Sequence, residues 1–122
     1  MKLFPILRYR DAKAAHAWLE AAFGLEPNAL HEGEGGTIAH AQMRWGDSMV
    51  MFGSAQDDAI GMRPGQGHVY LSCDDPDALY ARAVAAGAEV AMELTDLDYG
   101  SRDFSVRDPE GNVWSFGTYE PT

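Results

Sequence analysis

The sequence repeats itself once along its length, with a nearly constant spacing between matching residues. A tandem duplication keeps such an offset wherever neither copy has gained or lost residues. The matching anchors are Asp11 and Asp75, Gly24 and Gly87, Met43-Arg44 and Val106-Arg107, and Phe52-Gly53 and Phe116-Gly117. Subtraction of their numbers gives offsets of 64, 63, 63 and 64 residues. The 122 residues are therefore predicted to fold as two copies of one structural module.

The two halves also predict the same order of secondary structure. In the first half, alternation and capping residues predict a strand at 4–10, a helix at 12–23 between Asp11 and Gly24, a loop or short irregular strand at 26–36, and strands at 37–45 and 48–52. In the second half they predict a strand at 68–73, a helix from Pro76 to Gly87 capped by Asp75, a strand and turn at 89–98, and strands at 101–107 and 112–119. The expected fold class is α+β, a single domain over 1–122 with two βαβββ modules at about 3–53 and 67–120 and a linker at 54–66.

Composition narrows the function classes. Nineteen Asp and Glu against nine Lys and Arg give a formal net charge of −10, which repels nucleic acids and anionic lipid surfaces. We therefore expect neither as a partner. Cys73 is the single cysteine, so an internal disulfide is excluded and a cytoplasmic location is expected. The apolar run at 3–7 is too short for a signal-peptide core, and no window approaches the roughly 18 apolar residues of a membrane span.

Four segments carry a resemblance to a known family. They are LRYRDAKAAHAWLEAAFGL at 7–25, HAQMRWGDSMVMFG at 40–53, HVYLSCDDPDALYARAVAAGAE at 68–89 and YGSRDFSVRDPEGNVWSFGTY at 99–119. In these segments the chain resembles the glyoxalase, bleomycin-resistance and extradiol-dioxygenase superfamily, also called the vicinal oxygen chelate fold. The resemblance implies two modules whose mostly antiparallel sheets curl around a cup for a small molecule. It also implies a homodimer, because modules of this family pair across chains.

Many members of that family bind a divalent cation through four side chains, from the first and last strand of each module. The resemblance places these ligands at Phe4, Met51, His68 and Ser115. His68 is the one usual ligand in this set, since Phe has no donor atom, Met prefers soft metals and Ser is a weak neutral ligand. The departure argues against glyoxalase I, extradiol dioxygenase or fosfomycin-resistance activity by the family's standard mechanism. No cofactor is therefore expected, and His68 and His40 are the candidates for any metal.

Alternation along the strands predicts which side chains face the cup. Apolar residues such as Ala41 and Met43 are expected to face the helices, which leaves the intervening polar residues for the cavity. A floor of Phe4, Met49 and Met51 is expected beneath them. The predicted ligand-binding residues are His40, Gln42, Met51, His68, Tyr70, Asp103, Ser105 and Ser115. Polar groups above an apolar floor are typical of a small-molecule site.

Several of these residues also fit other roles. His40, His68 and Asp103 fit a non-standard metal site, an acid–base pair, or separate structural hydrogen bonds. Trp45 and Trp114 fit either stacking on a planar ligand or packing in the core. His16 and His31 are expected to be exposed and unpartnered. Asp74 and Asp75 are expected to raise the pKa of Cys73. Arg102, Arg107 and Asp108 fit ion pairs that pin the last turn.

Three functions are compatible with this set of residues. The first is a bleomycin-resistance-like binding protein that holds a small cationic or aromatic compound in an acidic cup, without a metal. The alternative is a metal-dependent lyase, isomerase or dioxygenase of the same superfamily, with a rearranged centre that uses His40 and His68. A regulatory cup is a third reading. A bound divalent cation that depends on these histidines would distinguish the second from the first.

Overall fold

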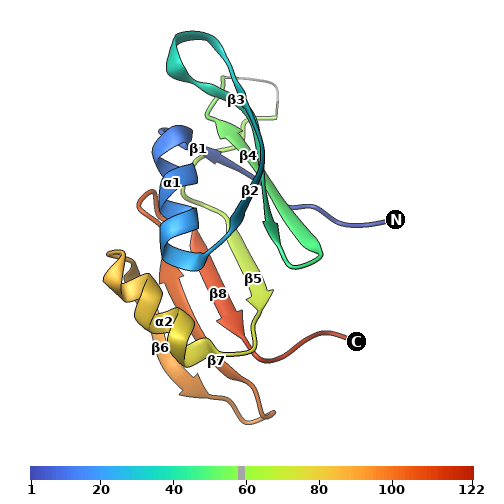
Figure 1. The fold of residues 1–122 in the computed structure, drawn as a ribbon, viewed down its shortest axis with the longest axis vertical. Helices are drawn as coiled ribbons and strands as arrows, with labels where there is room; N and C mark the ends of the chain where they lie inside the picture. The colour runs from blue at the N-terminus through green and yellow to red at the C-terminus, as the bar shows by residue number, and fades with distance from the viewer. Residues whose placement is uncertain (58–59) are drawn as a thin grey trace.

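A computed structural model describes residues 1–57 and 60–122, and shows two four-stranded sheets, each with one helix (Figure 1). The first module consists of β1 (Ile6–Tyr9), α1 (Ala12–Phe23), β2 (Glu26–Glu32), a short 3-10 turn (Glu34–Gly36), β3 (Ile38–Trp45) and β4 (Ser48–Ser54). The second consists of β5 (His68–Ser72), α2 (Pro76–Ala85), β6 (Glu89–Asp96), β7 (Arg102–Arg107) and β8 (Val113–Gly117). The predicted α+β class and the predicted order of elements are confirmed. No helix in the described part of the chain has the length and apolar character needed to cross a membrane.

Strand pairing confirms the internal repeat at the level of single residues. The sheet orders are β1-β4-β3-β2 and β5-β8-β7-β6, with the first pair of each sheet parallel and the others antiparallel. Met51 lies opposite Ile6 and Gln42 in the first sheet, and Ser115 lies opposite Tyr70 and Ser105 in the second. An offset of 64 relates Ile6 to Tyr70 and Met51 to Ser115, and an offset of 63 relates Gln42 to Ser105. Equivalent strand faces can therefore be compared residue by residue.

Both helices begin where the capping residues predicted, and α1 also ends there, whereas α2 ends at Ala85 with Ala86 as its cap, just before the predicted Gly87. The side chains of Asp11 and Asp75 accept hydrogen bonds from the backbone N–H groups of Ala14 and Ala78, at 3.0 and 3.1 Å. Gly24 closes α1 in the left-handed conformation, with φ of 76°, which glycine adopts without steric cost. The segment after α1 is the strand β2 and not a loop. Its side chains are almost all exposed, so it gives no alternation, and only main-chain pairing with β3 defines it.

The two helices lie on the same side of the sheets and are joined by reciprocal hydrogen bonds (Figure 1). Trp18 Nε1 donates to the carbonyl of Ala86 at the end of α2, at 3.1 Å. Arg82 donates in return to the carbonyls of Ala21 and Glu20 at the end of α1, at 3.0 and 3.1 Å. Trp18 and Arg82 are repeat equivalents, since 82 minus 18 is 64. The helix ends therefore hold the modules together with pseudo-twofold symmetry.

Aromatic packing at the end of α1 forms the centre of the junction between the modules. The ring of Phe23 lies 5.1 Å from Trp18, 5.4 Å from Trp114 and 4.8 Å from Phe116, measured between centroids. Trp114 is fully buried, which decides its role as a core residue and not a ligand platform. Since Trp114 and Phe116 belong to β8, a helix of the first module completes the core of the second.

Asp108 is a buried acceptor in the turn before β8. Its carboxylate accepts from the Tyr9 hydroxyl at 2.7 Å, from Trp114 Nε1 at 3.0 Å and from Asn112 Nδ2 at 3.1 Å. It also accepts from two backbone N–H groups of its own turn. Burial, and next the Asp108 charge, raises the pKa of Tyr9 far above its usual value, so the phenol stays a donor. Asp108 therefore pins the turn through hydrogen bonds.

The two arginines of β7 form ion pairs, as the sequence suggested, but with residues of α2 and β6 and not with the last turn. Arg102 pairs with Asp77 at 2.7 Å and with Asp96 at 3.0 Å, and Arg107 lies 3.8 Å from Glu89. The hydrogen bond from Arg102 lowers the pKa of Asp77. Both arginines therefore tie β7 to neighbouring elements.

Candidate functional site

The predicted site residues of the first module lie on the sheet face opposite the helices. His40 Nε2 donates to Gln42 Oε1 at 2.8 Å, because an amide oxygen can only accept. Gln42 Nε2 donates in turn to Asn28 Oδ1 at 2.7 Å. Met51 is the neighbour of Gln42 across the strand pair. This face therefore carries a hydrogen-bonded chain of His40, Gln42 and Asn28 beside the thioether of Met51.

The corresponding face of the second module carries a chain of hydroxyls. His68 Nε2 lies 2.7 Å from Ser115 Oγ, which lies 2.6 Å from Ser105 Oγ. Ser105 and Ser115 are partners in the β7–β8 register. His68 therefore hydrogen-bonds a residue of the neighbouring strand β8. A structural hydrogen bond of this kind was one of the roles that the sequence allowed for His68.

Tyr70 and Asp103 approach each other across β8. A side chain at Gly117 would clash with the Asp103 carboxylate and would meet the Tyr70 hydroxyl at 2.8 Å, so glycine is required there for close packing. Ser101 hydrogen-bonds Asp103, and the Tyr70 hydroxyl donates to the Tyr119 carbonyl at 2.6 Å. Burial, and next the Asp103 carboxylate, raises the pKa of Tyr70. The two groups therefore act as hydrogen-bonding residues of the second sheet.

These predicted residues form two sets on two separate sheets. Within residues 1–57 and 60–122 no strand of one sheet pairs with a strand of the other. The same described residues contain no group of three or more His, Cys, Asp and Glu side chains arranged to hold a metal. His40 has a different neighbour from the one expected, because His31 lies directly opposite it on β2.

The four family ligand positions do not fit a hard or borderline divalent cation. Phe4 offers no donor atom and Met51 offers a soft thioether. Ser115 and His68, the remaining two, hydrogen-bond each other. This donor set has a single imidazole and no carboxylate, whereas such cations require several of these ligands. No reaction step is derived through a metal at these positions.

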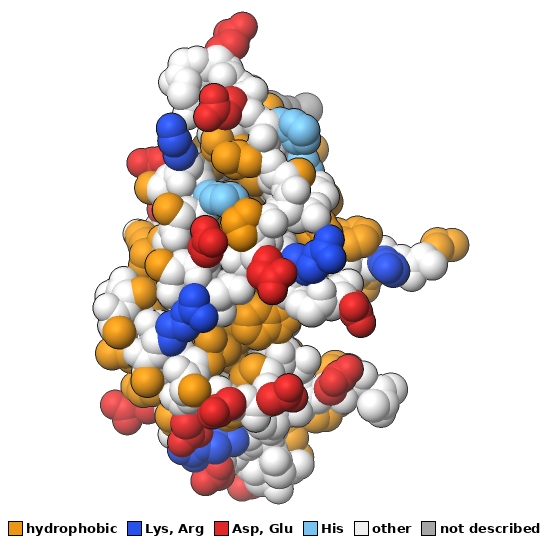
Figure 2. Space-filling model, viewed as in Figure 1, with side chains coloured by type: hydrophobic (Ala, Val, Ile, Leu, Met, Phe, Trp, Pro, Cys, Tyr) orange, Lys and Arg blue, Asp and Glu red, His pale blue; other side chains and the backbone are white. Residues whose placement is uncertain are grey.

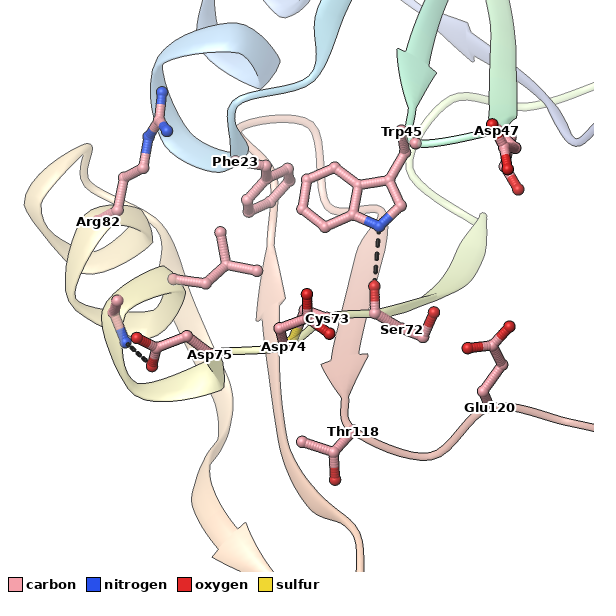
Figure 3. A pocket seen from close by; sticks show the side chains of 14 residues that line it. Phe23, Trp45, Asp47, Ser72, Cys73, Asp74, Asp75, Arg82, Thr118 and Glu120 are labelled. Carbon is pink, nitrogen blue, oxygen red and sulfur yellow. Dashed lines mark hydrogen bonds between the residues drawn. The ribbon is translucent and has the colours of Figure 1, made fainter.

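A concave feature lies at the junction of the modules, and we call it the junction groove. Its volume is about 680 Å³. It is lined by the end of α1, the β3–β4 turn, the segment after β5, α2 and the C-terminal segment, through Phe23, Trp45, Gly46, Asp47, Ser48, Ser72, Cys73, Asp74, Asp75, Ala78, Leu79, Arg82, Thr118 and Glu120 (Figure 3). Trp45 Nε1 donates to the Ser72 carbonyl at 2.9 Å and so bridges the two modules. In Figure 2 hydrophobic side chains line the hollow between the halves of the molecule, and acidic side chains stand around it.

The polar lining of the junction groove is mainly acidic. Among the described residues, no hydrogen bond or ion pair occupies the side chains of Asp47, Asp74 or Glu120. Arg82, the basic residue of the lining, is already bound to the end of α1. Burial, and next the Asp74 charge, raises the pKa of Cys73 to about 11. The thiol is therefore neutral near pH 7, as predicted, and the carboxylates are open to a ligand.

A second cavity of about 340 Å³ adjoins the groove and is more apolar. It shares Trp45, Ser48, Ser72 and Glu120 with the junction groove. Tyr70, one of the predicted ligand-binding residues, also lines it, together with Met49 of the predicted floor. Trp45 therefore contributes to both cavities while its ring also packs 5.7 Å from that of Phe116.

Sequence reasoning missed the groove because its lining comes from five separate segments. Asp47, Asp74 and Glu120 lie outside the strands, where alternation makes no prediction. The available signals were Trp45 at a strand end and the Asp74-Asp75 pair beside a predicted helix start. Neither signal indicates that the segments meet.

Comparison with known proteins agrees with this architecture. The family model described as Glyoxalase/Bleomycin resistance protein/Dioxygenase superfamily matches residues 4–116. The chain belongs to this superfamily. The protein CFP32 of Mycobacterium bovis is 32% identical over 101 residues, which cover 83% of this chain and 37% of CFP32. The chain therefore spans well under half of that superfamily relative.

Solved structures of this superfamily also superimpose on the chain. TioX from Micromonospora sp. ML1 is 28% identical, with a TM-score of 0.84 and coverage of 98% of this chain and 99% of TioX. TnmS3, an antibiotic binding protein from Streptomyces sp. CB03234, is 22% identical, with a TM-score of 0.74 and coverage of 93% and 90%. The glyoxalase-like fold expected from the resemblance is thus confirmed.

Proposed function

We propose that this protein binds a small organic molecule at the junction of its modules, without a metal. The observation that carries the proposal is the junction groove, where Trp45 and three carboxylates without a partner among the described residues line one hollow. Apolar walls with a few convergent polar groups are the usual composition of a ligand site. The antibiotic-binding activity named for TnmS3, whose structure shares this fold, supports this class of function.

The lining favours a ligand with a planar body and a positive charge. The indole of Trp45 offers a face for stacking, and a cation over an aromatic face gains about 0.5–2 kcal/mol. Asp47, Asp74 and Glu120 add carboxylates near that ring, in a protein whose net charge is already −10. An organic cation therefore gains from both features, whereas an anion is repelled. The single cysteine supports a cytoplasmic site for this binding.

Titration with 9-aminoacridine, a planar cation, is expected to quench tryptophan fluorescence with saturation, while neutral acridine binds more weakly. Replacing Asp74 by Asn and Glu120 by Gln together is expected to weaken 9-aminoacridine binding about tenfold, because two charges facing the cation are lost. The matched control, Glu32→Gln with Glu93→Gln, makes the same change in net charge at exposed strand positions outside the groove. Equal affinity of the two double variants would show that only overall charge matters and would refute the groove as the site.

We further propose that the protein is a homodimer. The sheet faces opposite the helices leave large apolar side chains exposed near the N-terminal segment, including Leu3, Phe4 and Ile6. A second copy that covers these residues would remove apolar surface from water and protect the strand edges. Light scattering at micromolar concentration is expected to give twice the chain mass of 13.3 kDa.

A charge placed within the proposed interface tests this dimer. Ile6→Glu is expected to shift the particle towards the monomer mass, because a carboxylate would be buried between the copies. Leu30→Glu, at an exposed position on β2 in the same sheet, is the control and should leave the mass unchanged. A wild-type protein that stays at 13.3 kDa would refute the dimer.

A further inference from the structure

The strand pair β2–β3 brings two histidines together that the sequence separates by nine positions. His31 and His40 are direct register partners, and their rings lie 6.3 Å apart between centroids with planes 22° from parallel. Directly opposed residues of an antiparallel pair share one face of the sheet, with Cβ atoms about 4.5–5.5 Å apart. Two imidazoles on such positions reach a common ion by rotation of their side chains alone.

The hydrogen bonds around His40 prepare one of its nitrogens for a ligand. Nε2 carries the ring proton, because it donates to Gln42 Oε1. Nδ1 is then the nitrogen with a free lone pair. Gln42 is itself held by Asn28, at 2.7 Å. Histidines that bind metals usually donate their other N–H to such a carbonyl oxygen, which fixes the ring and its tautomer.

His31 has no competing role in the described part of the structure. Its side chain is exposed, and no hydrogen bond or ion pair among residues 1–57 and 60–122 engages its ring. We propose that His31 and His40 form a two-histidine site for a borderline transition-metal ion, with Gln42 as the residue that positions His40. Neutral imidazole suits Zn²⁺, Ni²⁺ and Cu²⁺, and a surplus of acidic charge favours approach of any cation.

The proposed site is separate from the junction groove and from the four family positions. Neither histidine lines the groove, and neither occupies the positions of Phe4, Met51, His68 and Ser115. Two protein ligands leave the remaining coordination positions to water or to a donor atom of another molecule. A metal ion bound at this end of the first sheet would therefore keep coordination positions that another molecule can occupy.

Calorimetric titration of the untagged protein with Ni²⁺ is the direct test. We expect saturable binding of one ion per chain, and tighter binding when Cu²⁺ replaces Ni²⁺, in the Irving–Williams order. His31→Ala and His40→Ala should each weaken Ni²⁺ binding by more than about tenfold. His16→Ala and His68→Ala, the remaining histidines of the chain, should leave it unchanged. Circular dichroism on each variant checks that it is folded.

Two variants of Gln42 separate positioning from structure. Gln42→Leu removes the acceptor of the His40 proton and should weaken Ni²⁺ binding roughly tenfold, whereas Gln42→Glu keeps an acceptor and should retain it. Absence of saturable binding by the wild type would overturn the proposal, as would unchanged binding by folded His31→Ala. Loss of binding in His68→Ala alone would also overturn it and place the ion on the second sheet.

Discussion

Asp108→Ala is expected to destabilise the protein by about 3–5 kcal/mol, a large part of the total stability of a domain this size. The substitution leaves the Tyr9 hydroxyl and the Trp114 indole N–H fully buried without their acceptor. Each such orphaned group costs about 1–3 kcal/mol, and the turn loses two backbone hydrogen bonds as well. Thermal unfolding should show a melting temperature lower by roughly 10–20 °C.

Two variants give this prediction its controls. Asp98→Ala removes the same type of side chain from an exposed turn and should change the melting temperature by less than about 2 °C. Asp108→Asn keeps the shape and one acceptor oxygen, so its loss should fall between those of the other two variants. A melting temperature of Asp108→Ala within 2 °C of the wild type would contradict the role of Asp108 as a buried acceptor.

Much of the fold could be predicted because its determinants are local. The helix starts at Asp11 and Asp75 depend on side chains that bond a backbone N–H three residues later. The repeat then transfers each assignment from one half to the other. The sequence alone could not decide whether the segment that forms β2 is a loop or a strand. Its pairing with β3 depends on main-chain groups and leaves its side chains exposed.

The candidate site was less predictable, because it depends on how the modules meet. Alternation placed His40 and Gln42 on the cavity side of one strand and Ser105 on that of another, and the family resemblance added Ser115, which is the register partner of Ser105. Alternation carries no information about the distance between two faces. The His31–His40 pair was missed for a related reason, because a segment without alternation gave no register from which to pair the two histidines.

The two copies differ where they meet. The repeat equivalent of Phe23 is Ala86, at an offset of 63, and the repeat equivalent of Trp18 is Arg82. The first module thus contributes two aromatic rings where the second contributes a methyl group and a guanidinium. The junction is therefore asymmetric in its side chains, although hydrogen bonds run in both directions between the two helices.

Phe23→Ala is expected to destabilise the whole chain by about 3–5 kcal/mol. Phe23 is fully buried and packs on Trp18 of its own module and on Trp114 and Phe116 of the other. The cavity left behind would separate the aromatic rings that join the modules, so the loss should affect both halves. Urea denaturation followed by tryptophan fluorescence and by circular dichroism, at one protein concentration, measures the loss and its cooperativity.

A second substitution at Phe23 distinguishes an effect on packing from an effect on ligand binding. Phe23→Leu keeps most of the buried volume and should cost only about 1–1.5 kcal/mol, and it leaves Trp45, the half-exposed aromatic side chain of the groove, in place. Its affinity for 9-aminoacridine should therefore stay close to that of the wild type. If Phe23→Ala unfolds in a transition as steep as that of the wild type and at nearly the same urea concentration, the modules do not depend on this contact. A separated transition for each half would instead show that Phe23 is what makes the two modules unfold as one.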